Sequence, residues 1–183
     1  MKPIKYRVYF AHPMCTYNSI HEEYILEWFK QFPDVEVVNP NTPEHQEGCK
    51  TEGMSYFKPI VLSCDRLYAY GFGDNTIGAG VAQEMDWMQE KGGNVIFVSF
   101  HSGSTFERMV TETAAQQFKV LSVEETRAKL KSYELKDRKR ITELQTALEW
   151  SNSRLKSLSE GKPITDLNEC IFHSDLLLNS IKI

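Results

Sequence analysis

Segments typical of β-strands and of α-helices alternate through the first half of the chain, and this alternation constrains the fold more than any other feature. Short runs rich in aromatic and β-branched residues lie at 6–11, 35–38, 66–70 and 94–98. Apolar residues at three- and four-residue spacing predict helices at 17–32, 54–64 and 81–90. Such alternation implies right-handed crossovers, and therefore an α/β fold with a parallel sheet and helices on both faces.

Three other stretches complete this first part of the chain. Residues 39–43, Asn-Pro-Asn-Thr-Pro, are predicted to form a loop because two prolines and two asparagines disfavour regular structure. Residues 101–117 are polar, and we expect them to be irregular with at most one short helix. Residues 119–121 are predicted as a further strand, which gives a sheet of about five strands.

The C-terminal part is helical in character. From Ser122 to Ser159 the sequence is almost free of Gly and Pro, so we expect an α/β domain at 1–122 and a helical extension at 123–183. A short helix is predicted at 164–181. A heptad seam interrupted by Ser151 contains Ile141, Leu144, Leu148, Leu155 and Leu158. The seam either packs on its own domain or forms an interface, and we favour a homo-oligomer.

Composition excludes several classes of partner. The net charge of −4 provides no general basic field, which argues against a duplex nucleic acid and leaves a small-molecule ligand open. No run approaches a membrane span, and the N-terminal residues do not resemble a secretion signal. The four cysteines are far apart, as in a cytoplasmic protein with reduced thiols. His21 and His45 lack partners at ligand spacing, so we expect neither a metal nor a cofactor.

The segment 74–84, Asp-Asn-Thr-Ile-Gly-Ala-Gly-Val-Ala-Gln-Glu, is the most informative for chemistry. Gly78 and Gly80 at a strand-to-helix turn would allow a ligand to approach the backbone. Glu84 would fall in the first helical turn, where the helix dipole favours an ionised carboxylate that can stabilise or trap an oxocarbenium ion. Alternatively, Glu84 has no catalytic role and is simply an acidic residue near a helix N-terminus.

Four sequence segments form a recognisable set: Tyr-Phe-Ala-His-Pro at 9–13, Asn-Pro-Asn at 39–41, Gly-Met-Ser-Tyr-Phe at 53–57 before Cys64-Asp65, and Gly-Ala-Gly at 78–80 with Glu84. Over about residues 5 to 100, these segments resemble the nucleoside 2-deoxyribosyltransferase-like superfamily, and especially its uncharacterised branch from microbes and their viruses. The resemblance implies a flavodoxin-like, Rossmann-like fold and cleavage or exchange of an N-glycosidic bond. Glu84 matches the nucleophile and Tyr9 a tyrosine that positions it.

The remaining site candidates have structural alternatives. His12 could meet a phosphate or a base, or be a hydrogen-bonded loop histidine. Tyr17 and Asn18 could add polar contacts, although Asn18 could equally cap a helix. Asp74 could hold a ribose hydroxyl or a base edge, or serve the turn alone. Asp65 matches a family aspartate that could merely orient the backbone.

The first functional hypothesis is an N-glycosidase or 2-deoxyribosyltransferase that acts on a nucleoside or its 5′-monophosphate. A rival enzyme would attack another N-ribosyl bond, such as that of NAD. A rival of a different class is a nucleotide-binding sensor or scaffold that engages a partner through its C-terminal helices. The absence of the superfamily's base-protonating Asp supports this rival, because Phe57 or Lys58 stands near its place.

Overall fold

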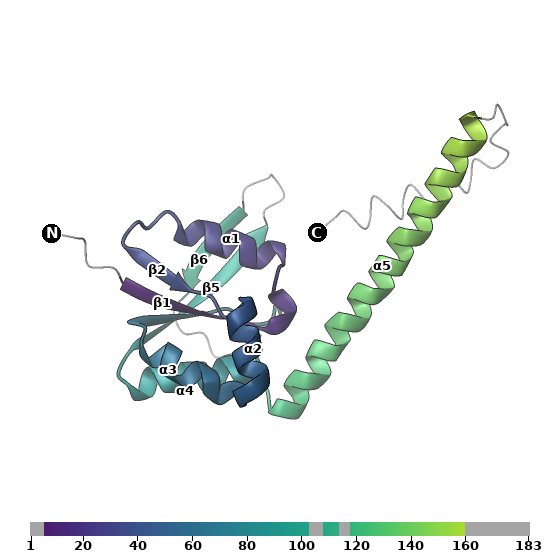
Figure 1. The fold of residues 1–183 in the computed structure, drawn as a ribbon. Helices are drawn as coiled ribbons and strands as arrows, with labels where there is room; N and C mark the ends of the chain where they lie inside the picture. The colour runs from purple at the N-terminus through teal and green to yellow at the C-terminus, as the bar shows by residue number, and fades with distance from the viewer. Residues whose placement is uncertain (1–5, 103–107, 114–117, 160–183) are drawn as a thin grey trace. The chain divides into compact units, whose positions relative to one another are not determined.

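The computed structural model describes residues 6–102, 108–113 and 118–159. A five-stranded sheet has the order β2-β1-β3-β5-β6, in which the first four strands are parallel and β6 is antiparallel to β5. Its strands are β1 (Tyr6–Ala11), β2 (Val35–Val38), β3 (Arg66–Ala69), β5 (Asn94–Ser102) and β6 (Arg108–Thr113). The α/β fold with a Rossmann-like parallel sheet and a C-terminal helix is therefore confirmed (Figure 1).

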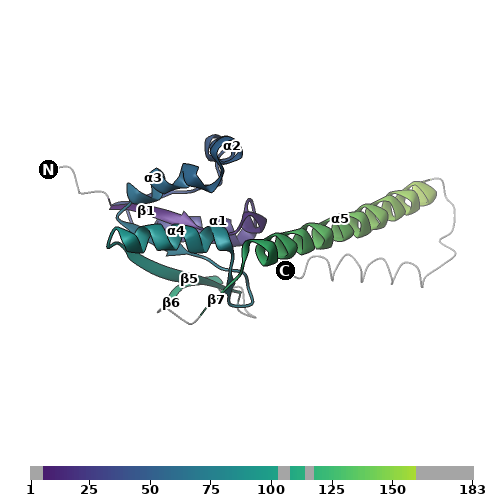
Figure 2. The same cartoon turned by 90° about the horizontal axis from the view of Figure 1, so that it is seen from below.

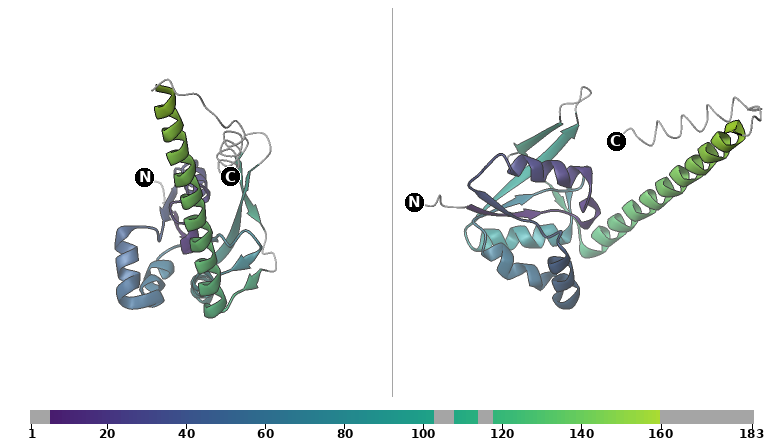
Figure 3. Two further views of the ribbon diagram at one scale, coloured as in Figure 1. Left: turned by 90° about the vertical axis from the view of Figure 1, so that its right-hand side faces the viewer. Right: turned by 45° about the horizontal axis from the view of Figure 1, so that its top comes forward.

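Helices cover both faces of this sheet. On one face lies α1 (Ile20–Phe29), while α3 (Phe57–Leu62) and α4 (Ala79–Glu90) lie side by side on the other (Figures 1 and 2). The sheet separates α1 from α3 and α4 in the right-hand view of Figure 3.

A hydrophobic cluster lies on each face of the sheet, and the residues of β1 contribute alternately to the two clusters. Val8 and Phe10 join the cluster with Ile25 and Phe29 of α1, while Tyr9 joins the cluster with α3 and α4. Successive side chains of a strand point to opposite faces, so Tyr9 must project toward α4.

The fifth strand of the main sheet is not the predicted one. Residues 119–121 instead contribute β7 (Lys119–Val120), which pairs with β4 (Thr76–Ile77) in a separate two-stranded sheet. The prediction that 101–117 are irregular or helical was wrong for 101–102 and 108–113, because β5 extends to Ser102 and β6 pairs with it. Residues 103–107 and 114–117 lie outside the described residues. The polar composition of β6 gave no local signal, since strand propensity depends strongly on the neighbouring strand.

Local capping explains two further differences. The predicted loop at 39–43 ends in α2 (Pro43–Glu52), whose N-cap Thr42 accepts a hydrogen bond from the His45 amide. Pro43 fits because proline is tolerated at the first helical position. The helix predicted at 54–64 is divided into the 3-10 turn η2 (Gly53–Tyr56) and α3, and Pro59 lies in the first turn of α3.

The loop after β1 contains the 3-10 turn η1 (Met14–Thr16) and leads to α1, whose N-cap is Ser19 and not Asn18. Asn18 adopts a left-handed conformation with φ of 57°. Asparagine tolerates this conformation better than most residues, which allows the chain to turn sharply before α1.

The predicted long helix is α5 (Val123–Ser159). The chain divides into two compact units at 1–130 and 131–183, so the first two turns of α5 belong to the α/β unit. In the second unit Ile141, Leu148 and Leu155 are exposed, and the predicted oligomer interface stays a prediction. The helix predicted at 164–181 lies outside the described residues. None of the described helices is both long and apolar enough to span a membrane.

Candidate functional site

Glu84 lies in α4, on the face that packs against the sheet. Gly78 is the N-cap and Ala79 the first helical residue, so Glu84 belongs to the second turn. The sequence-based prediction had placed it in the first turn. The residue is buried, with only 4% of its surface exposed.

Tyr9 is the partner of this carboxyl group. Its hydroxyl donates a hydrogen bond of 2.7 Å to Glu84 Oε1, and the tyrosine is itself fully buried. Phe57 packs edge-on against the Tyr9 ring, with 6.4 Å between the ring centroids. The geometry therefore brings together the two residues that the resemblance had paired, although they are 75 positions apart.

Burial changes the ionisation of both residues. Loss of solvent raises the pKa of Glu84 to about 8, although the hydrogen bond from Tyr9 acts in the opposite direction. The pKa of Tyr9 is also well above its ordinary value, because of burial and then of the nearby Glu84 charge. The expectation that the helix dipole keeps the Glu84 carboxylate ionised is therefore wrong, because burial raises its pKa. The dipole effect fades beyond the first turn, while desolvation acts in full on a buried acid.

The sheet topology directs attention to the loops after β1 and β3. The chain connects β1 to β2 on one side, and β3 lies on the other, so strand order reverses at β1. Ligands of open α/β sheets bind outside the carboxyl ends of the strands at such a switch point.

Tyr17, in the loop after β1, lies close to this region. The pKa of Tyr17 is raised mainly by burial, and the charges of Glu84, Cys49 and Glu22 add to the effect. Its ring lies 5.0 Å from that of His12. Tyr17 is thus a neighbour of two buried carboxyl groups, Glu84 and Glu22.

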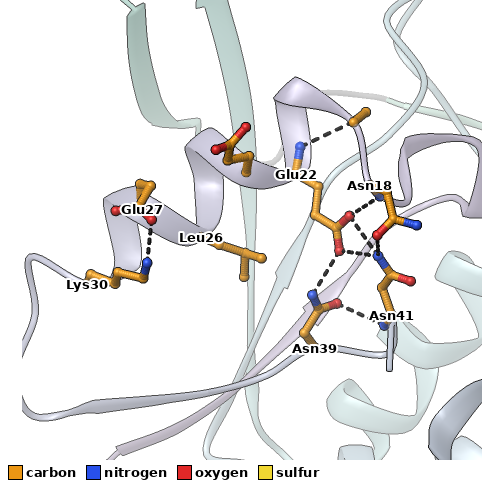
Figure 4. A pocket seen from close by; sticks show the side chains of 9 residues that line it. Asn18, Glu22, Leu26, Glu27, Lys30, Asn39 and Asn41 are labelled. Carbon is orange, nitrogen blue, oxygen red and sulfur yellow. Dashed lines mark hydrogen bonds and ion pairs between the residues drawn. The ribbon is translucent and has the colours of Figure 1, made fainter. Parts of the chain in front are cut away.

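Glu22 is the centre of a second buried cluster, which the sequence interpretation missed. Its carboxylate accepts hydrogen bonds of 2.8 and 2.9 Å from the side-chain amides of Asn39 and Asn41, and another from the Asn18 backbone amide (Figure 4). His12 Nε2 lies 3.3 Å from Glu22 Oε1. The cluster joins the loops that follow β1 and β2.

The donors around Glu22 determine its ionisation. Burial by itself raises the pKa of Glu22, but hydrogen bonds from His12, Asn39, Asn41 and the Asn18 amide outweigh burial and lower the pKa to about 2. The Ser19-to-Glu22 spacing is that of a capping box, which was the available sequence signal. That motif predicts only a local contact, whereas the asparagines come from another loop.

Both ring nitrogens of His12 face protein acceptors. Nδ1 lies 2.9 Å from the Phe10 carbonyl oxygen, and Nε2 faces the Glu22 carboxylate. His12 is thus directed toward the protein, in line with the loop-histidine alternative.

An open hollow of about 480 Å³ adjoins this cluster (Figure 4). It is lined by Asn18, Ser19, Glu22, Glu23, Leu26, Glu27, Lys30, Asn39 and Asn41. Asn18 is therefore the one sequence candidate that borders it, and Glu84 is not among its lining residues. Because Glu22 already accepts several hydrogen bonds, the hollow does not present it as an unsatisfied charge.

The glycine-rich turn is occupied by protein side chains. A Cβ atom on Gly78 would lie 3.1 Å from Thr126 and 3.3 Å from Phe72, and one on Gly80 would lie 3.4 Å from Met54. At Gly78, side chains therefore fill the space that a ligand was expected to use. Asp74 is exposed and forms an ion pair with Lys129.

Other positions to which the resemblance drew attention have structural partners. Asp65 accepts a hydrogen bond of 2.8 Å from the Arg7 amide, which fits a role in orienting the backbone. Phe57 is buried against Tyr9, and the Lys58 ammonium lies 5.9 Å from the centre of the Trp87 ring. Neither side chain supplies a carboxylic acid at the place of the base-protonating aspartate.

Within the part of the chain that the structure describes, no group of three or more His, Cys, Asp or Glu residues could hold a metal ion. Comparison of the chain with protein-family models, curated proteins and solved structures finds no match. The functional assignment therefore depends on the geometry of the chain's own residues.

Proposed function

We propose that the protein cleaves the N-glycosidic bond of a nucleoside or nucleoside 5′-monophosphate, with Glu84 as the nucleophile. The observation that carries the proposal is the buried pair formed by Glu84 Oε1 and the Tyr9 hydroxyl, 2.7 Å apart. A carboxylate held in a site with little water interacts strongly with the positive charge that develops on an oxocarbenium ion. Resemblance to the deoxyribosyltransferase-like superfamily supports the same assignment of both residues.

In the proposed reaction, an oxygen of ionised Glu84 forms a bond to the anomeric carbon as the carbon–nitrogen bond breaks. The base leaves with the bonding electron pair and takes a proton from water, and the water that later attacks the glycosyl ester returns a proton to the solvent. Water then attacks the glycosyl ester, which releases the sugar and regenerates Glu84, or a second base does so in a transfer reaction. Hydrolysis is the favoured outcome.

Tyr9 would orient the carboxylate through its hydrogen bond and stabilise the ionised form. The proton that Glu84 holds at neutral pH must leave before it attacks. We therefore expect kcat/KM to rise with pH up to about 8, where the Glu84 pKa lies, and to level off above it. A fall of activity above this pH would instead indicate that Glu84 acts as a proton donor.

A nucleotide-binding sensor is the second candidate. The raised pKa of Glu84 favours it, because a protonated carboxyl group is a poor nucleophile. A sensor would bind nucleotides with unchanged affinity in a Glu84→Gln variant and release no base in either form.

The deciding experiment incubates the protein with ribo- and deoxyribonucleosides, their 5′-monophosphates and NAD, and measures free base by chromatography. Glu84→Gln should lower turnover by roughly a thousandfold or more. Glu90→Gln is the matched control, since Glu90 is an exposed residue of the same helix. Base release that persists in Glu84→Gln would refute the proposal. Calorimetric binding without base release would favour the sensor.

A further inference from the structure

The glycine-rich turn that leads to Glu84 is bound along its length by the segment just before and at the start of α5. β7 pairs with β4 in parallel register, Thr76 with Lys119 and Ile77 with Val120. The Leu121 amide then donates a hydrogen bond of 2.8 Å to the Ile77 carbonyl. These contacts follow the chain to the last residue before the N-cap of α4.

Thr126, in the first turn of α5, continues this contact. Its hydroxyl accepts a hydrogen bond of 2.9 Å from the backbone amide of Ala79, the first residue of α4. Gly78, the N-cap of α4, has no side chain to accept such a bond. Thr126 therefore satisfies one of the unpaired amides of the helix N-terminus from 47 positions away in the sequence.

Lys129 lies one turn further along α5. Its ammonium group donates a hydrogen bond of 2.7 Å to the Thr76 hydroxyl and forms an ion pair with Asp74. It also lies 4.7 Å from the centre of the Phe72 ring. The lysine side chain is largely buried, with 18% of its surface exposed, whereas its ion-pair partner Asp74 is 59% exposed. The contacts with Thr76 and Phe72 therefore matter more for holding Lys129 than the ion pair does.

We propose that Thr126 and Lys129 are positioning residues, which fix the glycine-rich turn and the start of α4 so that Glu84 is held against Tyr9. The inference rests on the proposed function for its catalytic consequence. Asp74 then serves the reaction as an anchor for Lys129 and not as a ligand for ribose. The first two turns of the C-terminal helix become part of the site.

The test uses the full-length chain with Thr126→Val and Lys129→Met. Thr142→Val and Lys131→Met are matched controls, because both residues are exposed positions of the same helix. Turnover should fall about tenfold in each positioning variant, with a smaller change of KM, since a small displacement of a reacting group costs rate. The controls should keep wild-type turnover.

Two further measurements report on positioning without any substrate. Hydrogen exchange should become faster at the Ala79 amide in Thr126→Val. Carbon-13 NMR of the Glu84 carboxyl group should show its pKa moving down toward the ordinary value in both positioning variants, as water gains access. Thr126→Ser retains the hydroxyl and should restore the wild-type values, which a general loss of packing would not explain.

Unchanged turnover, exchange and Glu84 titration in folded Thr126→Val and Lys129→Met would overturn the inference. If the wild-type protein releases no base, the proposed function fails, while exchange and titration still decide whether the two residues position Glu84. Thermal unfolding of each variant verifies that it is folded. If Thr126→Val does not fold, Lys129→Met and Lys129→Arg provide the same comparison.

Discussion

Glu84 and Glu22 are equally buried, yet their environments drive their ionisation in opposite directions. Each exposes 4% of its surface. Among the described residues, the Tyr9 hydroxyl is the donor that reaches Glu84, whereas two asparagine amides, a backbone amide and His12 surround Glu22. The pKa is about 8 for Glu84 and about 2 for Glu22. Burial alone therefore does not determine the charge of a carboxyl group, because the number of donors around it can reverse the effect.

The two sites consequently suit different tasks. Glu22 is a satisfied anion that connects the loops after β1 and β2, which is a structural role. Glu84 is a buried carboxylic acid with few hydrogen-bond donors, so a nearby positive charge would strongly stabilise its ionised form. This environment suits the catalytic role that we propose. Four predictions test this contrast.

The largest expected effect separates the two residues by activity. Glu84→Gln should abolish base release, a loss of about 4 kcal/mol or more in transition-state stabilisation, and should not lower the thermal midpoint below that of the wild type. Glutamine retains the size of the side chain and resembles the neutral acid. Turnover and calorimetric melting of the same samples measure both properties. A thermal midpoint that collapses in Glu84→Gln would place Glu84 in the structural class with Glu22.

Glu22→Ala should show the reverse pattern. It leaves the amides of Asn39, Asn41 and Asn18 and the buried His12 without their acceptor, which we expect to cost about 3 kcal/mol in the free energy of unfolding. Urea unfolding measures the loss. Glu23→Ala, an exposed residue beside it in α1, is the control and should change stability little. Equal stability of the two variants would contradict the role assigned to the Glu22 cluster.

The pH dependence of stability should carry opposite signs at the two sites. Glu84 holds its proton more tightly when folded, so its contribution is complete below the ordinary pKa of 4.5 and is lost as pH rises to about 8. Glu22 contributes above 4.5, and its contribution is lost as pH falls toward 2. Each proton changes the slope by at most about 1.4 kcal/mol per pH unit.

Unfolding experiments from pH 3 to 9 on the wild type, Glu84→Gln and Glu22→Gln isolate these contributions. Relative to each variant, the wild type should lose stability between pH 4.5 and 8 because of Glu84, and below pH 4.5 because of Glu22. Parallel curves for the wild type and Glu84→Gln would show that the Glu84 pKa is not raised.

The smallest effect is expected at the Tyr9 hydroxyl. Tyr9→Phe removes the hydrogen bond that favours ionised Glu84, so the pKa of Glu84 should rise further and the activity profile should move to higher pH. The loss in stability should be about 1 kcal/mol, as for one buried hydrogen bond. A pH–rate profile identical to that of the wild type would show that Tyr9 does not control Glu84.

Several elements could be predicted because their signals are local. The apolar run in β1 and the spacing of apolar residues in α1 and α4 indicated strands and helices at nearly the observed positions. β6 and α2 were missed for different reasons. β6 depends on its pairing with β5, which is a tertiary contact, whereas the Thr42-Pro43 start of α2 was a local signal hidden among loop-forming residues.

By itself, the sequence determined the alternation that makes a parallel α/β sheet and the long C-terminal helix, while the pairing of Glu84 with Tyr9 was implied by a family resemblance. Only the tertiary structure decided that burial raises the pKa of Glu84, that hydrogen-bond donors lower the pKa of the equally buried Glu22, and that Thr126 caps the helix of Glu84. The reason is physical. Periodicity is encoded by neighbouring residues, whereas ionisation and capping depend on donors, acceptors and solvent exclusion that distant segments supply.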